Sequence, residues 1–258
     1  MVRELLIRGM LVGLLAGSLV FAFARIFGEP QVETAIAFET ALNNAKMKAD
    51  LAKGVHDEPQ PELVSRAVQA SLGLLTGVMV YATAFGGLFA LVFAFAYGRI
   101  ALLGPRPLSA LLAVLGFISL YLVPNLKYPA NPPSIGIADT IGIRTALYFS
   151  MMASSVVAMV GAVYLRKRLA RNYSSWNAAL IASAAYLAIV ILVAAVFPPV
   201  NEVPRNFPAV GLWRFRIDSI AMQAIMWATF GLVFGALTEN SSIGRLYQVS
   251  GYPSANWR

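Results

Sequence analysis

Three glutamates stand at positions where a carboxylate is able to bind a metal ion. Glu29 and Glu33 are four residues apart, so on a helix both carboxylates lie on one face. Glu202 lies within a proline-rich stretch. Carboxylate oxygens suit divalent cations of hard or intermediate character, so we predict Glu29, Glu33 and Glu202 as metal ligands. The alternative for the first pair is that both acids solvate an exposed helix and complement its N-terminal dipole.

A proline-rich pattern occurs twice in the chain. KYPANPPSIG (127–136) and EVPRNFPAVG (202–211) align without a gap and share two prolines, an asparagine and a final glycine. Proline fixes φ and disfavours helix in the residue before it, so each loop is extended and presents unpaired carbonyls. Asn131 and Asn206 hold the same place in the two loops and add an amide oxygen, so we predict that both bind substrate. Alternatively, the prolines only end helices at a membrane surface.

Two arginines open long apolar runs, Arg144 in the fourth run and Arg216 in the sixth. Because a guanidinium grips planar anions, we predict that both bind an anionic substrate such as a chelated metal or a phosphate. The structural alternative is anchoring at a membrane interface, with pairing to Asp139 or Asp218.

These residues are carried by a chain with the composition of a membrane protein: 59% of residues are hydrophobic and 12% charged. Lipid offers the backbone no hydrogen-bond partners, and the apolar runs do not alternate with polar residues as barrel strands do. We therefore predict an all-α polytopic membrane protein, a single integral membrane domain over residues 1–258. The six expected transmembrane helices cover residues 5–27, 71–97, 108–123, 145–165, 178–197 and 219–237. The third run is short, so the alternative is a protein with five spans in which that segment enters the membrane and returns to the same side.

Charge distribution predicts the orientation of the spans. Basic residues cluster in the short loops and termini on one side, whereas ten of the twelve acidic residues fall on the other. By the positive-inside rule both termini are cytoplasmic, and the basic loops contact membrane lipid. The net charge of +8 is then a topology signal and predicts no nucleic-acid partner.

The two proline loops fall on the outer side, each between an outgoing and a returning helix. We therefore expect a parallel internal repeat of two helical hairpins, the third to fourth and the fifth to sixth spans. The polar segment 28–66 is expected on the same side, with an amphipathic helix directly after the first span. Gly9, Gly13 and Gly17 in the first span predict close helix packing.

Several function classes find no support in the residues. No P-loop motif is present, and no nucleophile–base pair falls in the spans, so we predict that the protein is not an enzyme and holds no resident cofactor. No acidic or basic residue stands convincingly at mid-membrane, which disfavours a proton-coupled pump. Zero cysteines and a single histidine, His56, exclude a thiolate site and a self-contained histidine site.

Four stretches of the chain resemble the CbtA family of predicted cobalt transporter subunits: GEPQVETAIAFE, LKYPANPPSIG with TIGIRTALYF, NEVPRNFPAVGLWRFRIDS, and WATFGLVFGAL. The resemblance implies a bacterial or archaeal inner-membrane protein that takes up cobalt for cobalamin synthesis. It also implies a small single-span, histidine-bearing partner of the CbtB type. Some relatives carry more histidine in the first outer loop, and the lone His56 here argues against a metal site in that loop or shifts such a site to the partner.

Two functions therefore stand side by side. In the first, the chain is a cobalt transport subunit whose proline loops and outer glutamates form a vestibule for a divalent metal ion. In the second, it is a non-transporting membrane scaffold that assembles with a metal-binding partner.

Overall fold

The computed structural model describes residues 2–53, 64–99, 103–133 and 135–240, and within these residues every regular element is a helix. Six of the helices are long and apolar enough to span a membrane, which confirms the predicted number of spans. The third has 23 residues and is long enough to cross, so the re-entrant alternative is not needed. The six ranges are Val2–Leu51, Arg66–Ala96, Pro105–Lys127, Ala138–Leu169, Ser175–Val196 and Ala209–Glu239.

Several of these helices contain a π-helical turn. The first comprises α1 (Val2–Phe23), the π segment Ala24–Gly28 and α2 (Glu29–Leu51). The second comprises α3 (Arg66–Val68), the π segment Gln69–Gly73 and α4 (Leu74–Ala96), and the third α5 (Pro105–Gly116), the π segment Phe117–Leu122 and α6 (Val123–Lys127). The fourth and fifth are α7 (Ile141–Leu169), preceded by a 3₁₀ turn, and α8 (Ser175–Val196). The last comprises α9 (Ala209–Thr229), the π segment Phe230–Phe234 and α10 (Gly235–Glu239).

Two helices extend well beyond the predicted spans. The first helix does not stop before Glu29 and Pro30, because the wider π turn just before them accommodates a proline that has no N–H and whose ring would clash with a regular helix. The last helix begins at Ala209, well before residue 219. Gly211 and Asp218 therefore both lie within this helix.

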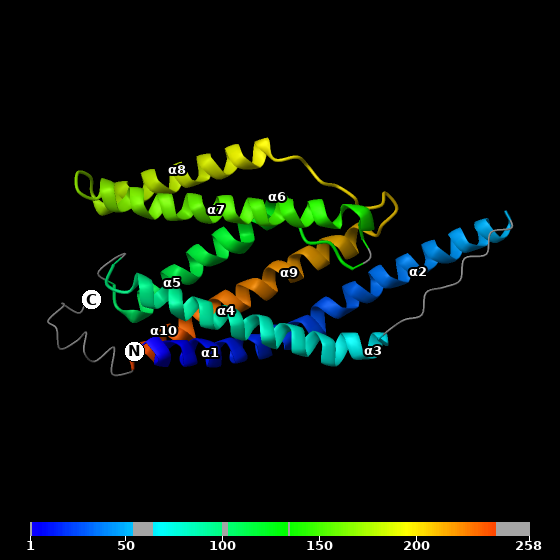
Figure 1. Ribbon diagram of the computed structural model, residues 1–258, viewed down its shortest axis with the longest axis horizontal. Coiled ribbons are helices and arrows are strands. Elements are labelled where there is room, and N and C mark those ends of the chain that lie inside the picture. Colours follow the sequence, from blue (N-terminus) through cyan, green and yellow to red (C-terminus); the bar gives the residue numbers. More distant parts are fainter. Residues whose placement is uncertain (1, 54–63, 100–102, 134, 241–258) are drawn as a thin grey trace.

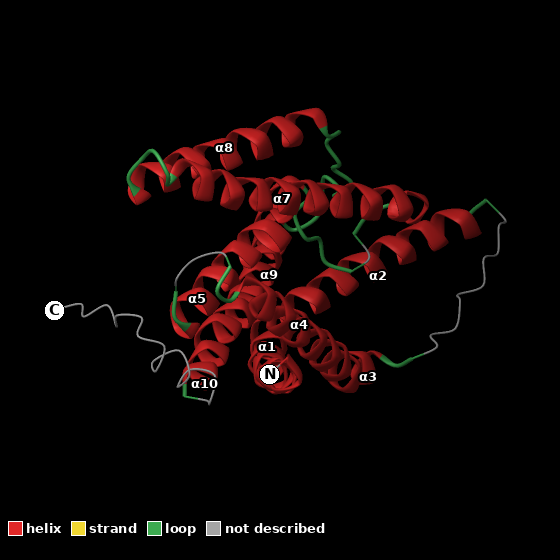
Figure 2. Cartoon of the chain, turned by 60° about the vertical axis from the view of Figure 1, so that its left-hand side comes forward, coloured by secondary structure: helices red, strands yellow, loops and turns green. Residues whose placement is uncertain are grey.

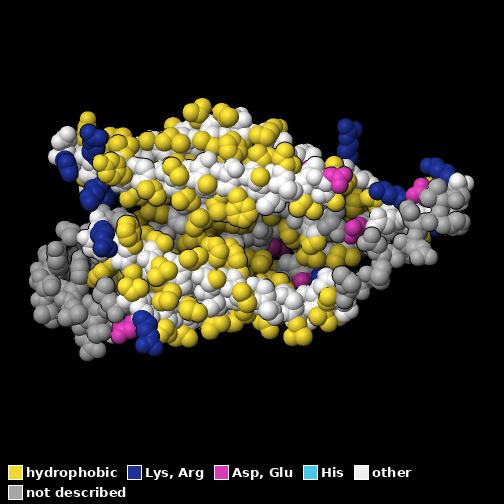
Figure 3. All heavy atoms as spheres, in the orientation of Figure 1, with side chains coloured by type: hydrophobic (Ala, Val, Ile, Leu, Met, Phe, Trp, Pro, Cys, Tyr) yellow, Lys and Arg dark blue, Asp and Glu magenta, His cyan; other side chains and the backbone are white. Residues whose placement is uncertain are grey.

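The helices form two layers. α7 and α8 pack as an antiparallel pair on one side, and α1 packs along α4 on the other (Figures 1 and 2). Between them, α9 contacts α1 and α5, while α6 and the adjoining π segment contact α7. The N-terminus and the α7–α8 turn lie at one end, and the two proline loops lie at the other (Figure 1). Basic side chains gather at the end that holds the N-terminus (Figure 3).

The seam between α1 and α4 is unusually close. A Cβ added at Gly86 would lie 2.2 Å from the Gly9 carbonyl oxygen, and one added at Gly13 would lie 2.5 Å from the Ala82 carbonyl oxygen. The predicted packing of the first-span glycines is therefore confirmed, and their partner is another helix of the same chain. On α4 the contact is made by Gly86, whereas Gly77 faces open space.

Candidate functional site

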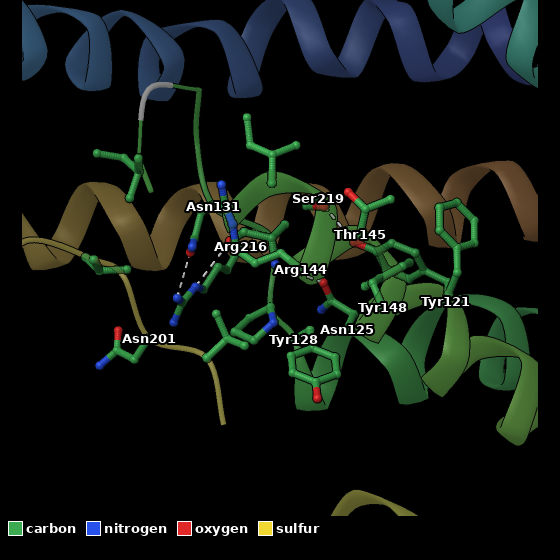
Figure 4. Close-up of a pocket in the computed structure, with 17 residues that line it drawn as sticks. Tyr121, Asn125, Tyr128, Asn131, Arg144, Thr145, Tyr148, Asn201, Arg216 and Ser219 are labelled. Carbon is green, nitrogen blue, oxygen red and sulfur yellow. Dashed lines mark hydrogen bonds between the residues drawn. The ribbon is translucent and has the colours of Figure 1, made fainter. Parts of the chain in front are cut away.

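A cavity of about 440 Å³ lies at the loop end, between α7, α9, the α6 region and the two proline loops (Figure 4). Its polar lining comes from all of these elements. The polar residues are Tyr121, Asn125, Tyr128, Asn131, Arg144, Thr145, Tyr148, Asn201, Arg216 and Ser219. The space-filling view is hollowed between the two helix layers toward the same end (Figure 3).

Glu202 ties the second proline loop to the first. Its carboxylate accepts hydrogen bonds from the Ile137 backbone N–H at 2.8 Å and from the Thr140 hydroxyl at 2.6 Å. The Arg144 Nε lies 3.3 Å from the same carboxylate. The Thr140 hydroxyl, the Ile137 N–H and the Arg144 charge together lower the pKa of Glu202, so the group is ionised at neutral pH. These contacts bring two loops that are 65 residues apart into one structure.

The first loop bends at Gly136, where φ is +129°, a region that favours glycine. The Arg144 guanidinium lies against this glycine and donates to the Ile137 carbonyl at 3.1 Å. Ile135, just before the bend, is buried with Phe207 of the second loop and Ala35 of α2. An apolar contact thus supports the polar one from the side of α2.

Arg216 holds the other part of the first loop. From α9 its Nη2 donates to the Asn131 side-chain oxygen at 2.9 Å, and its Nε donates to the Ala130 carbonyl at 3.3 Å (Figure 4). The Ala130 N–H in turn donates to Asn125 at 3.2 Å. Arg216 is half-buried, and within the described part of the chain it forms no ion pair.

The structure brings together three of the four predicted substrate-binding residues. Asn131, Arg144 and Arg216 all line the cavity. Asn206 is exposed on the second loop and is absent from the lining, because Phe207 beside it takes the buried position. The two loops therefore match in sequence without presenting their asparagines in the same way.

The three predicted metal ligands are not gathered. Glu29 is buried and forms an ion pair with Arg66 at the start of the second span, whereas Glu33, one turn further on, is exposed. Glu202 is engaged by Arg144, as described above. Over residues 2–53, 64–99, 103–133 and 135–240 no group of three or more acidic, histidine or cysteine side chains is placed to hold a metal ion. His56 lies outside the described residues.

Some residues of the site carried little sequence signal. Three polar residues line the cavity from within apolar helices: Asn125, Thr145 and Tyr148. A single polar residue in an apolar helix does not by itself indicate a site. Arg66 was foreseeable, since it opens the second span directly opposite Glu29 at the end of the first. Opposite charges at the adjoining ends of two antiparallel helices predict an ion pair between them.

A second cavity, of about 300 Å³, lies further along α9. Its lining includes Met222, Gln223 and Met226 from α9 together with Tyr81 from α4. Ser219 in the first cavity and Gln223 in the second are one helical turn apart, on the same face of α9. The next turn of α9 is closed by buried aromatic rings: Phe89 stacks on Phe230 with ring centroids 5.6 Å apart, and Trp227 meets Phe230 edge-on.

Comparisons with known proteins give one match. A family model described as "Probable cobalt transporter subunit (CbtA)" matches residues 2–239, a range that includes all six candidate spans. No curated protein and no solved structure matches the chain.

Proposed function

Because this chain belongs to the CbtA family of probable cobalt transporter subunits, we propose that it takes up cobalt and that the cavity between its proline loops is the outer vestibule. The observation that carries the proposal is the meeting of the two loops over one cavity, with Asn131, Arg144 and Arg216 in its wall. A transporter needs a cavity that one side of the membrane can reach, and the geometry supplies one at a single end of the helix bundle.

The distribution of charge supports an orientation with both termini in the cytoplasm. The basic side chains at the N-terminal end suit the cytoplasmic face, and in the proposed orientation the proline loops and α2 then lie outside (Figure 3). α2 then serves as the expected outer helix: Ala35 and Phe38 pack against the second loop, while residues 41–49 are exposed. A bacterial or archaeal inner membrane is the location that follows from the family.

Helix contacts support the proposed parallel repeat. If the third span corresponds to the fifth and the fourth to the sixth, a contact between the third and sixth spans must be matched by one between the fifth and fourth. Both exist: α5 packs against α9 and the π segment after it, and α8 packs against α7. In the proposed repeat, an axis along the membrane normal would relate these pairs. The packing of α6 on α7, between the third and fourth spans, has no comparable counterpart between α8 and α9 in the described part of the chain.

The two cavities along α9 support a route through the protein. Cargo in the outer cavity passes Ser219 to reach Gln223, Met222 and Met226 in the second cavity. Beyond the second cavity the rings of Phe89, Trp227 and Phe230 pack against one another, and in this proposal they form the inner barrier of the route. Movement of that barrier is the step that releases cargo inside.

The outer acids have separate parts in this proposal. Glu33 is exposed and forms no ion pair with any described residue, so of the three acids it is the carboxylate left available to a cation outside the cavity. Glu29 and Glu202 contribute chiefly by pairing with arginines, which fixes α3 and the loops. Any dedicated metal-binding histidines belong to a small single-span partner, and the cobalt taken up serves cobalamin synthesis.

The alternative is a scaffold that does not itself transport. The observation that favours it is that the described residues gather no metal-ligand cluster, along the spans or elsewhere. In this reading the cavity and loops receive the partner, and the partner handles the metal.

Uptake of radioactive cobalt into proteoliposomes separates the two functions. We expect the purified chain to mediate uptake, and Asn131→Ala to lower it because the Arg216 contact is lost. Asn206→Ala is the matched control, since that residue is exposed and lies outside the cavity wall. Uptake only when the single-span partner is present, and unchanged by Asn131→Ala, would establish the scaffold instead.

A further inference from the structure

We propose that the outer cavity binds a small organic carboxylate, and that cobalt reaches it as an anionic chelate rather than as the bare dication. The cobalt part of this inference rests on the proposed function, whereas the anion site stands on the geometry alone. The charges of the cavity wall, its free hydrogen-bonding groups and its volume each support it.

The charge of the wall favours an anion. Two guanidinium groups, those of Arg144 and Arg216, line the cavity, and of the described residues no Asp or Glu does so. Glu202 offsets the charge of Arg144 from the rim, but Arg216 has no carboxylate partner in the described chain. Asp218 is two positions from Arg216 on α9, so it points to another face of the helix. The wall therefore carries a net positive charge, which repels a free dication.

The wall also leaves donors available for an oxygen-rich ligand. Arg216 uses Nε and Nη2 on the first loop, so the N–H groups of Nη1 remain. The Thr145 and Tyr148 side chains face the cavity and form no hydrogen bond with any other described residue. Guanidinium, hydroxyl and phenol groups converging on one space are the donor set that carboxylate oxygens require.

The size of the cavity fits a chelate better than an ion. A volume of about 440 Å³ lies in the range of small-molecule sites, and most of it would stay empty around a single metal ion. A tricarboxylate complex of cobalt provides both the negative charge and the bulk. The asparagines at 125, 131 and 201 complete a polar wall around such a ligand.

Citrate binding to the full chain in phosphatidylcholine nanodiscs tests the site. We expect saturable binding of labelled citrate, weakened about tenfold or more by Arg216→Gln because the positive charge and the Nη1 donors are lost. Arg216→Lys retains the charge but not the planar guanidinium donors, so its citrate affinity should fall between those of the wild type and Arg216→Gln. Arg214→Gln is the matched control: Arg214 is exposed on the same helix and does not line the cavity, so its loss should leave affinity unchanged. Gel filtration and thermal unfolding establish that each variant is folded.

Four results would overturn the site. They are no saturable citrate binding by the wild type, equal loss in Arg214→Gln and Arg216→Gln, equal binding of inorganic phosphate, and displacement of citrate by phosphatidylglycerol added to the nanodiscs. The last two would assign the cavity to a phosphate group, free or on a lipid head.

Cobalt uptake from cobalt citrate and from cobalt chloride separates this inference from the proposed function. Faster uptake from the citrate complex, lost in Arg216→Gln, is the expected result. Equal uptake from both salts, unaffected by Arg216→Gln, would leave the transport function standing and remove the inference. Arg216-dependent citrate binding without cobalt uptake from either salt would leave the anion site standing and remove the transport function.

Discussion

Replacing Gly86 by alanine tests whether the α1–α4 seam holds the bundle together. The new Cβ would lie 2.2 Å from the Gly9 carbonyl oxygen and 2.9 Å from the Gly13 Cα. Ordinary contacts between such atoms begin near 3.4 Å, so the two helices must separate by roughly 1 Å. Both obstacles are backbone atoms, so no rotamer change relieves the clash.

The magnitude follows from two opposing terms. Forcing an extra methyl group into a packed interface costs about 1–3 kcal/mol. Alanine also favours a helix over glycine by about 1 kcal/mol, and this gain is common to any helical glycine. Gly77→Ala on the same helix receives only the gain, because nothing lies within 4 Å of its Cβ. The difference in unfolding free energy between the two variants therefore isolates the seam, at about 1–3 kcal/mol.

Thermal unfolding of detergent-purified protein, followed by the loss of the monodisperse gel-filtration peak, measures this difference. We expect the Gly86→Ala midpoint to fall below that of the wild type and the Gly77→Ala midpoint to equal or exceed it. Equal midpoints for the two variants would refute the reasoning, because the close approach of α1 and α4 would then contribute nothing to stability.

Three further predictions concern the loop end. Glu29→Gln should destabilise the protein by about 1–3 kcal/mol, because it leaves Arg66 partly buried without its partner. Adding Arg66→Met should restore much of the lost stability, and a double-mutant cycle of unfolding temperatures measures the recovery. The pKa of Glu202 is lowered on folding, so its contribution to stability is present at neutral pH and disappears as the pH falls below about 4.5. The difference in unfolding temperature between the wild type and Glu202→Gln should therefore vanish over that pH range. A difference that stays constant with pH would contradict this prediction. Gly136→Ala should lower both stability and cobalt uptake, because its Cβ would lie 2.5 Å from the Arg144 guanidinium. Gly98→Ala is the control: Gly98 also has a positive φ but no atom lies near its Cβ, so this change should lower stability alone.

The number of spans was predictable because it depends on a single property of the sequence. Apolar runs long enough to cross lipid have few alternatives to helix, and six of them were found. The boundaries were less predictable, since a proline usually ends a helix. At Pro30 and Pro124 a π segment precedes the proline and lets the helix continue, and π segments have no simple sequence signature.

The candidate site was predictable only in part, and for a physical reason. Arg144, Arg216 and Asn131 stood out because charges and repeated prolines are rare in an apolar chain, and these residues do meet. Whether a carboxylate is free to bind a metal depends on which cation lies across from it in space. Arg66 occupies that place for Glu29, a pairing that the facing ends of the first two spans suggest. Arg144 occupies it for Glu202, and that pairing does not follow from spacing along the chain.

The unbroken helix from Val2 to Leu51 gives the protein a long reach. At 1.5 Å per residue its 50 residues extend about 75 Å, more than twice the thickness of a hydrocarbon layer of about 30 Å. Its distal part, residues 41–49, is exposed on every side. The helix continues from this tip through the π turn Ala24–Gly28 into α1, so a molecule that binds the tip contacts the same helix whose glycines pack against α4.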